Sequence, residues 1–207
     1  MRALDIFPII MINSQTAATA ALIALAAYLI IITALHVLPT GYRLADHAVS
    51  DYGVGRYARL FHTGLIVNSL GVLALAAALA LAPNLDPPTT PLVYLVLLPV
   101  ARIGIAVFPT DLEGRGLTPT GIAHYLSAIA AFTLTYLAID GLTPTLRAAT
   151  SHPDVPHWLA IATPVLLAAV AVTMFRPLRR LFGVTERLFL LVTNAWYVAA
   201  ALIVLAR

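Results

Sequence analysis

The sequence of 207 residues contains no cysteine and no lysine, and only 10% of its positions carry a charge. Without cysteine, the chain has no disulfide framework, no thiolate metal site and no cysteine nucleophile. Soluble domains are about one quarter charged, so this scarcity of charge excludes an ordinary soluble domain. The net charge of +3, without a basic tail or patch, argues against a nucleic-acid partner.

Apolar residues take the place of the missing charges. They make up 61% of the chain, and the mean hydropathy of +0.94 indicates a membrane protein. Six apolar segments reach or approach the roughly 20 residues that cross the hydrocarbon layer of a bilayer. These segments are 17–38, 60–82, 91–108, 119–139, 157–175 and 185–206.

The six segments have the pattern of helices. They are continuous runs rich in Ala and Leu, without the alternating apolar and polar residues of a transmembrane barrel strand. The connectors between them are rich in Pro, Gly and Asp, which end helices. We therefore expect an all-α polytopic membrane protein of the cell membrane, with one domain over 1–207 folded as a single bundle of six transmembrane helices. The apolar stretch 3–12 is too short to span, and we expect it to be an interfacial lead-in to the first helix.

The arginines are distributed unevenly between the two sides of the expected bundle. With six spans, the connectors after the first, third and fifth helices lie on one side, and both termini lie on the other. The positive-inside rule predicts that the side with more arginines is cytoplasmic. The connector side holds Arg43, Arg56, Arg59, Arg102, Arg115, Arg176, Arg179, Arg180 and Arg187, whereas the terminal side holds Arg2, Arg147 and Arg207.

Polar residues also gather on the connector side. The run HAVSDYGVGRYARLFH (47–62) joins the first two helices, and the third connector supplies Asp111 and Glu113. His124 follows one turn into the fourth helix, and Glu186 begins the sixth. Topology therefore predicts that these side chains share one end of the bundle.

Helical spacing predicts which faces of three helices point inward. Residues three, four, seven or eleven apart share a face, and small or hydroxylated residues mark contacts between membrane helices. On this basis helices two, four and six should turn polar stripes toward the interior. The stripes are His62 with Ser69 on the second helix, His124 with Ser127, Ala128, Ala131 and Thr135 on the fourth, and Glu186 with Thr193 and Tyr197 on the sixth.

Arg102 lies inside the third apolar segment, about 9 Å along the axis from Phe108. An arginine at the bilayer centre costs about 2.5–3.5 kcal/mol on insertion scales, so it usually faces the interior or finds a partner. We expect an ion pair with Asp51, Asp111 or Glu186. Extension of the side chain to the interface is the alternative.

Four runs resemble, in the same order, a family of bacterial and archaeal membrane proteins known as domain of unknown function 998. The runs are HAVSDYGVGRY (47–57), ARIGIAVFPTD (101–111), TPTGIAHYLSA (118–128) and GVTERLFLL (183–191). The resemblance implies a small polytopic membrane protein with its signature on one side, and it implies no activity. Thr185 departs from the aliphatic residue or Phe typical before the Glu-Arg pair. The signature positions are Ser50, Asp51, Tyr52, Gly53, Arg102, Asp111, His124, Glu186 and Arg187.

One functional hypothesis is an interfacial enzyme or binding site for a membrane lipid or lipid-linked group. Asp51, Asp111 and His124 are the candidate catalytic residues, because carboxylates and imidazole serve as general acids and bases. Arginines suit an anionic phosphate or carboxylate ligand. The candidate binding residues are Ser50, Arg56, Arg102, Glu186 and Arg187.

A metal variant of this hypothesis would use His62, Asp111 and His124, with His47 as a possible addition. No local ligand spacing supports it, and we expect no metal ion. A haem between His62 and His124 would use the same pair of imidazoles. The sequence identifies no cofactor.

Two further classes of function fit the same residues. In a structural or accessory subunit, a buried ion-pair network would fix the bundle. In a small transporter or channel, Arg102 and the His, Asp and Glu residues would relay ions or protons. The sequence shows no inverted repeat to support the second of these.

Overall fold

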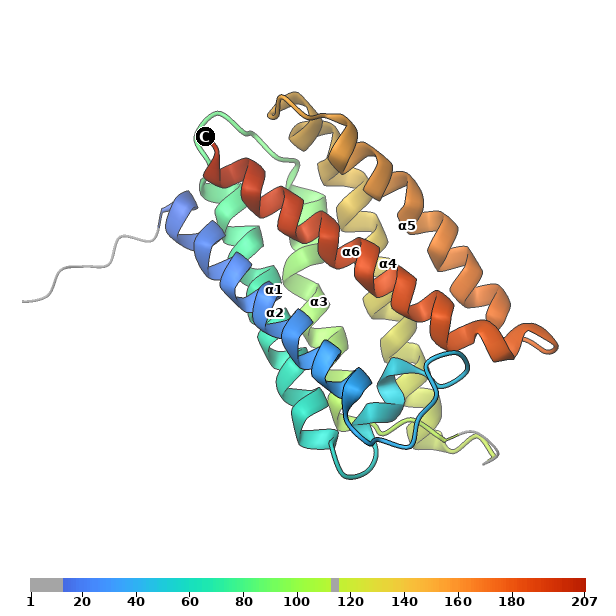
Figure 1. The fold of residues 1–207 in the computed structure, drawn as a ribbon. Coiled ribbons are helices and arrows are strands. Elements are labelled where there is room, and N and C mark those ends of the chain that lie inside the picture. The colour runs from blue at the N-terminus through green and yellow to red at the C-terminus, as the bar shows by residue number, and fades with distance from the viewer. Residues whose placement is uncertain (1–12, 113–115) are drawn as a thin grey trace, which may run out of the picture.

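The computed structural model describes residues 13–112 and 116–207 (Figure 1). Each of its six long helices has the length and composition to cross a membrane, and the described residues include no strand. The prediction of an all-α protein with six apolar spans is therefore confirmed. The predicted lead-in, Arg2, Glu113 and Arg115 lie outside the described residues. The helices are α1 Ser14–Val37, α2 Ala58–Leu81, α3 Thr89–Val107, α4 Pro119–Ala148, α5 Asp154–Thr173 and α6 Phe182–Leu205, with 3₁₀ helices η1 Val49–Gly53 and η2 Leu178–Leu181.

The observed helix bounds lie within three residues of the predicted ones, except at the end of α4. This helix passes Pro144 and ends at Ala148, whereas the sequence predicted an end at 139. Thr143 explains the extension, because its hydroxyl donates to the Ile139 carbonyl at 2.6 Å and accepts from Trp196 Nε1 of α6 at 3.0 Å. Tertiary contact thus stabilises a helix that Gly141 and Pro144 would weaken in isolation.

The helices run roughly along one common direction, and α6 lies between α1 and α2 on one side and α4 and α5 on the other (Figure 1). The start of α1 and the end of α6 lie at the same end of the bundle (Figure 1). The connectors that follow α1, α3 and α5 form the opposite end, which we name the connector end.

Glycines allow neighbouring helices to approach closely. A Cβ on Gly64 would lie 3.1 Å from Ile31 Cγ2, and one on Gly71 would lie 3.2 Å from Ala24 Cβ, so α2 packs tightly on α1. A Cβ on Gly104 of α3 would overlap the Ser127 hydroxyl of α4. Lipid gives helices little hydrophobic reason to associate, so close backbone packing of this kind holds membrane bundles together.

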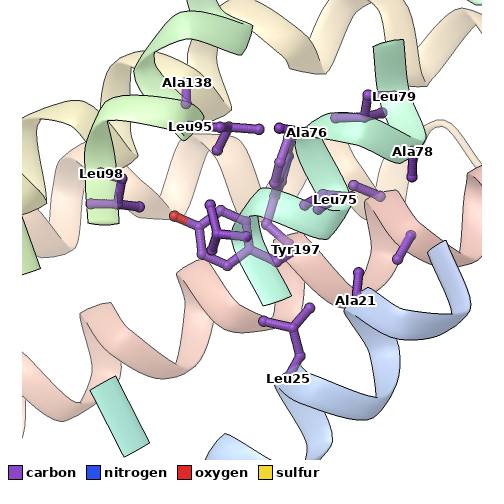
Figure 2. Close-up of a cluster of buried hydrophobic side chains, with 14 of the residues drawn as sticks. Ala21, Leu25, Leu75, Ala76, Ala78, Leu79, Leu95, Leu98, Ala138 and Tyr197 are labelled. Carbon is purple, nitrogen blue, oxygen red and sulfur yellow. The ribbon is translucent and has the colours of Figure 1, made fainter. Parts of the chain in front are cut away.

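The half of the bundle away from the connector end is filled by apolar side chains. Five helices contribute to this cluster, as Figure 2 shows for ten labelled residues. Leu25, Leu75, Leu95 and Ala138 are fully buried in it, and the ring of Tyr197 reaches in from α6. Protein interiors pack with few voids, and this cluster leaves the outer and inner cavities nearer to the connector end.

Candidate functional site at the connector end

The connector between α1 and α2 rests directly on the start of α6. A Cβ on Gly183 would lie 2.5 Å from the carbonyl oxygens of Leu44 and His47, so only glycine leaves room for the connector backbone. Next to it, the Val184 N–H donates to the Ala45 carbonyl at 3.2 Å. This contact brings η1, with Ser50 and Asp51, against α6.

Arg187 fixes the same connector through several donors. Its Nη1 donates to the carbonyls of Leu44, His47 and Gly183 at 3.0, 2.8 and 2.9 Å. Its Nε donates to His36 Nε2 at 2.8 Å, and its Nη2 donates to the Tyr52 hydroxyl at 3.3 Å. The guanidinium therefore joins α1, the connector and α6.

Below the connector lies a cavity of about 230 Å³, which we name the outer cavity. Ile129 of α4 and Ala171 of α5 line it and are exposed, so it opens to the surface between these two helices. Its polar end consists of Asp46, Ser50, Asp51, Thr110, Asp111, His124, Arg179 and Glu186. Its apolar wall includes Ile129, Phe132, Leu167, Val170, Ala171 and Met174.

A smaller inner cavity of about 70 Å³ continues from the outer one. Arg102 lines it together with Tyr28 and Asn68. A side cavity of about 190 Å³ reaches the same point from α2 and α3. The residues shared by the outer and inner cavities are Ser50, His124, Ala128, Phe132 and Glu186, and Ser50 and His124 line all three.

Two buried carboxylates meet the backbone at the start of η1. Asp51 Oδ2 accepts from the Ala48 N–H at 3.0 Å, and Glu186 Oε2 accepts from the Val49 N–H at 2.6 Å. Each residue is 6% exposed. Burial raises the pKa of Asp51 because it disfavours the charged form; His47, the Ala48 N–H and two arginines partly offset the rise.

Asp111 has a structural contact in addition to its place in the outer cavity. Its carboxylate accepts from the Thr118 N–H at 2.8 Å and from the Thr118 hydroxyl at 2.9 Å. The Thr118 hydroxyl in turn caps α4 by accepting from the Gly121 N–H at 3.0 Å. A Cβ on Gly121 would overlap the Asp111 carboxylate, so α4 begins with this aspartate packed against its first turn.

His124 is held in one orientation. Its Nδ1 lies 2.7 Å from the Phe108 carbonyl oxygen, and the residue is 2% exposed. A carbonyl oxygen only accepts, so Nδ1 carries a proton, and in the neutral form of the ring Nε2 is the acceptor. An imidazole fixed in this way has the geometry of a general base, as well as that of a hydrogen-bond partner for a ligand.

Among the residues that the structure describes, Arg102 has no acidic partner. The predicted ion pair with Asp51, Asp111 or Glu186 is wrong, because no ion pair joins Arg102 to an acid in the described chain. Backbone groups and Thr118 engage those carboxylates instead. Arg102 is 9% exposed, the Tyr197 hydroxyl faces its guanidinium, and its Nη1 has no hydrogen-bond partner among the described residues.

The remaining candidates lie outside the main cavities. Arg56 is exposed, with its guanidinium 5.5 Å from the Tyr57 ring centroid, and Arg187 lines a separate cavity with His36. His62 lines only the side cavity, and His47 contacts Asp46 at 3.2 Å. Among the described residues, no group of three or more His, Asp or Glu side chains is placed to hold a metal ion, and His62, Asp111 and His124 are not grouped in this way. The alternative of a haem between His62 and His124 is untested.

The expected inward stripes of α4 and α6 are confirmed by burial of Thr135, Thr193 and Tyr197. On α2 the predicted face is wrong by one residue. Ser69 lines an outer groove and donates to the Leu65 carbonyl, whereas Asn68 is buried and donates to Asn194 Oδ1 at 2.8 Å. A lone asparagine in an apolar helix was the signal for this pair.

Sequence reasoning also missed Arg179 as a site residue. It lies on η2 and lines the outer cavity, where its charge acts on Asp51. Seven residues separate it from Glu186, but a 3₁₀ turn and a helix start lie between them. No helical spacing could therefore relate the two.

Comparison with known proteins gives one match. A family model described as "Protein of unknown function (DUF998)" matches residues 22–203, which is most of the chain. The match includes every residue that lines the outer and inner cavities. No curated protein and no solved structure matches.

Replacement of Asp51 by Asn should stabilise the protein increasingly as the pH rises. A raised folded pKa means that the contribution of Asp51 to stability is present below its ordinary pKa of 3.8 and is lost as the pH rises through the folded value. Asn keeps an acceptor for the Ala48 N–H without a charge. Melting temperatures of the purified protein from pH 4 to 9 test this.

Asp46→Asn is the control of opposite sign. The pKa of Asp46 is lowered to about 2, chiefly by its hydrogen bond with Arg43, so its loss should destabilise the protein slightly above pH 4. A difference between wild type and Asp51→Asn that does not vary with pH would contradict the assignment of a buried, charge-disfavouring site to Asp51.

Proposed function

The chain belongs to the DUF998 family, and from its cavities we propose that it binds an amphiphile of the cell membrane. The ligand is a lipid or lipid-linked molecule whose polar group lies at the connector end and whose chain lies along α4 and α5. The outer cavity carries this proposal, because it has a polar end, an apolar wall and an opening between two helices.

The composition of the cavity matches such a ligand. Most binding sites are largely apolar with a few converging polar groups, and 230 Å³ is close to the lower end of their usual size. Phe132, Leu167 and Val170 offer contact to an alkyl chain, worth about 0.8 kcal/mol per buried methylene. Ser50, Asp51 and Glu186 offer hydrogen bonds to the polar group.

The bilayer itself supplies the route to the site. All six helices have the length and composition to span a membrane, and the opening lies between two of them. An amphiphile can therefore enter sideways, without leaving the lipid. Exposed Val165 and Val172 on α5 also suit contact with alkyl chains.

Catalysis on the bound polar group is a second candidate function, and one observation favours it. The contact between His124 Nδ1 and the Phe108 carbonyl leaves Nε2 as an acceptor in the polar end of the cavity. It could take a proton from a ligand hydroxyl or from water. Asp51 and Asp111 line the same cavity and, when protonated, could donate a proton to the ligand.

Transport has less support from the geometry. The polar cavities gather at the connector end, and the apolar cluster around Leu75, Leu95 and Ala138 occupies the other half of the bundle (Figure 2). A path for an ion would have to pass through these fully buried side chains. A buried ion-pair scaffold also lacks support, because Arg102 has no ion pair with the acids proposed for it.

Ala171→Trp should weaken amphiphile binding at least tenfold. The indole would occupy the alkyl path, and the loss of only two methylene contacts corresponds to more than a factor of ten. The adjacent Val172→Trp is the matched control, because Val172 is exposed and does not line the cavity. Native mass spectrometry of the full chain titrated with hexadecanol measures the occupancy. Equal occupancy in both variants would contradict the proposed site.

If the protein is an enzyme, His124→Asn should abolish conversion of a bound lipid while leaving its binding within about threefold. The asparagine amide keeps a donor at the position of Nδ1, toward the Phe108 carbonyl, and lacks the basic Nε2. Incubation of the protein with a total membrane lipid extract, followed by mass spectrometry of the lipids, tests this. No wild-type change in any lipid, or an equal change with the variant, would contradict catalysis and leave binding as the function.

A further inference from the structure

Arg102 is a buried charge whose hydrogen bonds are incomplete. It lies five residues before the end of α3, about 8 Å along the axis, and is 9% exposed. Its Nη1 is the one buried side-chain nitrogen or oxygen without a hydrogen-bond partner among the described residues. A buried donor left unsatisfied costs about 1–3 kcal/mol, and more when it is charged. We therefore expect a ligand to supply the missing hydrogen-bond acceptor.

No carboxylate in residues 13–112 and 116–207 forms an ion pair with Arg102. Glu186 lines the same inner cavity, but its Oε2 is held by the Val49 N–H, and no ion pair connects the two side chains. The hydroxyls of Tyr28 and Tyr197 are polar neighbours of the guanidinium. Because these hydroxyls are neutral, they leave the positive charge uncompensated.

Arg102 lines two hollows of different character. Arg102 also lines a groove on the outer surface between α2 and α3, where its neighbours are apolar apart from Ser69. Ser69 already donates to the Leu65 carbonyl. The inner cavity, in contrast, is lined by Tyr28, Asn68 and Thr135 and continues into the outer cavity.

The inner cavity is small. Its volume of about 70 Å³ compares with about 30 Å³ for one water molecule in the liquid, so it holds one compact polar group. A zwitterionic headgroup with a bulky substituent does not fit there. A carboxylate or a phosphate monoester presents its oxygens at the end of a chain and needs no space beyond them.

We propose that Arg102 binds the terminal oxyanion, carboxylate or phosphate monoester, of a single-chain amphiphile. The inference rests on the proposed function and adds the ligand class. The oxyanion occupies the inner cavity against Arg102, where a guanidinium can donate two parallel hydrogen bonds to it. The chain passes Ala128 and Phe132, which line both cavities, and leaves between α4 and α5.

In this arrangement neither Asp51 nor Glu186 is needed as the counter-ion of Arg102. The oxyanion neutralises Arg102, while Asp51 and Glu186 remain engaged with the backbone of η1. A cationic head would instead place a second positive charge beside a guanidinium that has no counter-ion. The uncompensated charge on Arg102 therefore selects against cationic amphiphiles.

The experiment compares four probes of equal chain length on the purified full chain by native mass spectrometry. The probes are hexadecanoate, hexadecyl phosphate, hexadecanol and hexadecylamine. Charge-assisted hydrogen bonds predict that at least one of the two anions binds about 10- to 100-fold more tightly than hexadecanol, and that hexadecylamine binds most weakly. The anion that shows the preference identifies the head as carboxylate or phosphate.

Arg102→Gln should remove the preference for anions while leaving the affinity for hexadecanol within about threefold. Arg102→Lys should retain part of it, because the charge remains without the guanidinium fork. Arg59→Gln is the matched control, since Arg59 lies exposed at the same end of the bundle, and it should leave all four affinities unchanged.

Two results separate this inference from the proposed function. Suppose that hexadecanol binds, that Ala171→Trp weakens its binding, and that neither anion binds more tightly than hexadecanol. The oxyanion site is then wrong and amphiphile binding stands. If no probe responds to Ala171→Trp, the proposed function itself is wrong. An equal preference for anions over hexadecanol in wild type and Arg102→Gln also overturns the inference. This preference is a ratio of affinities within each protein, so it does not depend on the stability of the variant.

Discussion

The contact between the first connector and the start of α6 is the constraint on which the site depends. Gly183 allows the connector backbone to lie on the helix, and Arg187 holds it there through the carbonyl oxygens of Leu44 and His47. In this position the Val49 N–H donates to the Glu186 carboxylate, and Ser50 lines the outer cavity below the connector. Without this contact, the outer cavity would lose Ser50 and Asp51 from its polar end.

The two halves of the bundle differ in the composition of their buried side chains. Apolar side chains fill the terminal half, whereas the connector half keeps Arg102, His124 and Glu186 around connected cavities. Capping contacts that look structural also position chemistry: Asp111 caps the start of α4 through Thr118, and the Phe108 carbonyl sets the tautomer of His124. Stability and a binding site thus use the same hydrogen bonds.

Hydropathy and topology predicted the six helices and the end of the bundle where polar residues meet, because both depend on chain length and on the bilayer. The resemblance to the DUF998 family was confirmed over residues 22–203. What failed depended on side-chain geometry. The partner of Arg102, the inward face at Asn68 and the passage of α4 through Pro144 are decided by tertiary contacts that no spacing in the chain records.

The docking of the connector on α6 can be measured directly, because the chain has no cysteine to interfere. The Val184 N–H and the Ala45 carbonyl oxygen are 3.2 Å apart, so cysteines introduced by Ala45→Cys and Val184→Cys should form a disulfide rapidly under mild oxidation in membranes. The added change Arg187→Ala should slow this crosslinking several-fold. A pair that does not crosslink, or that does so equally fast without Arg187, would contradict the account.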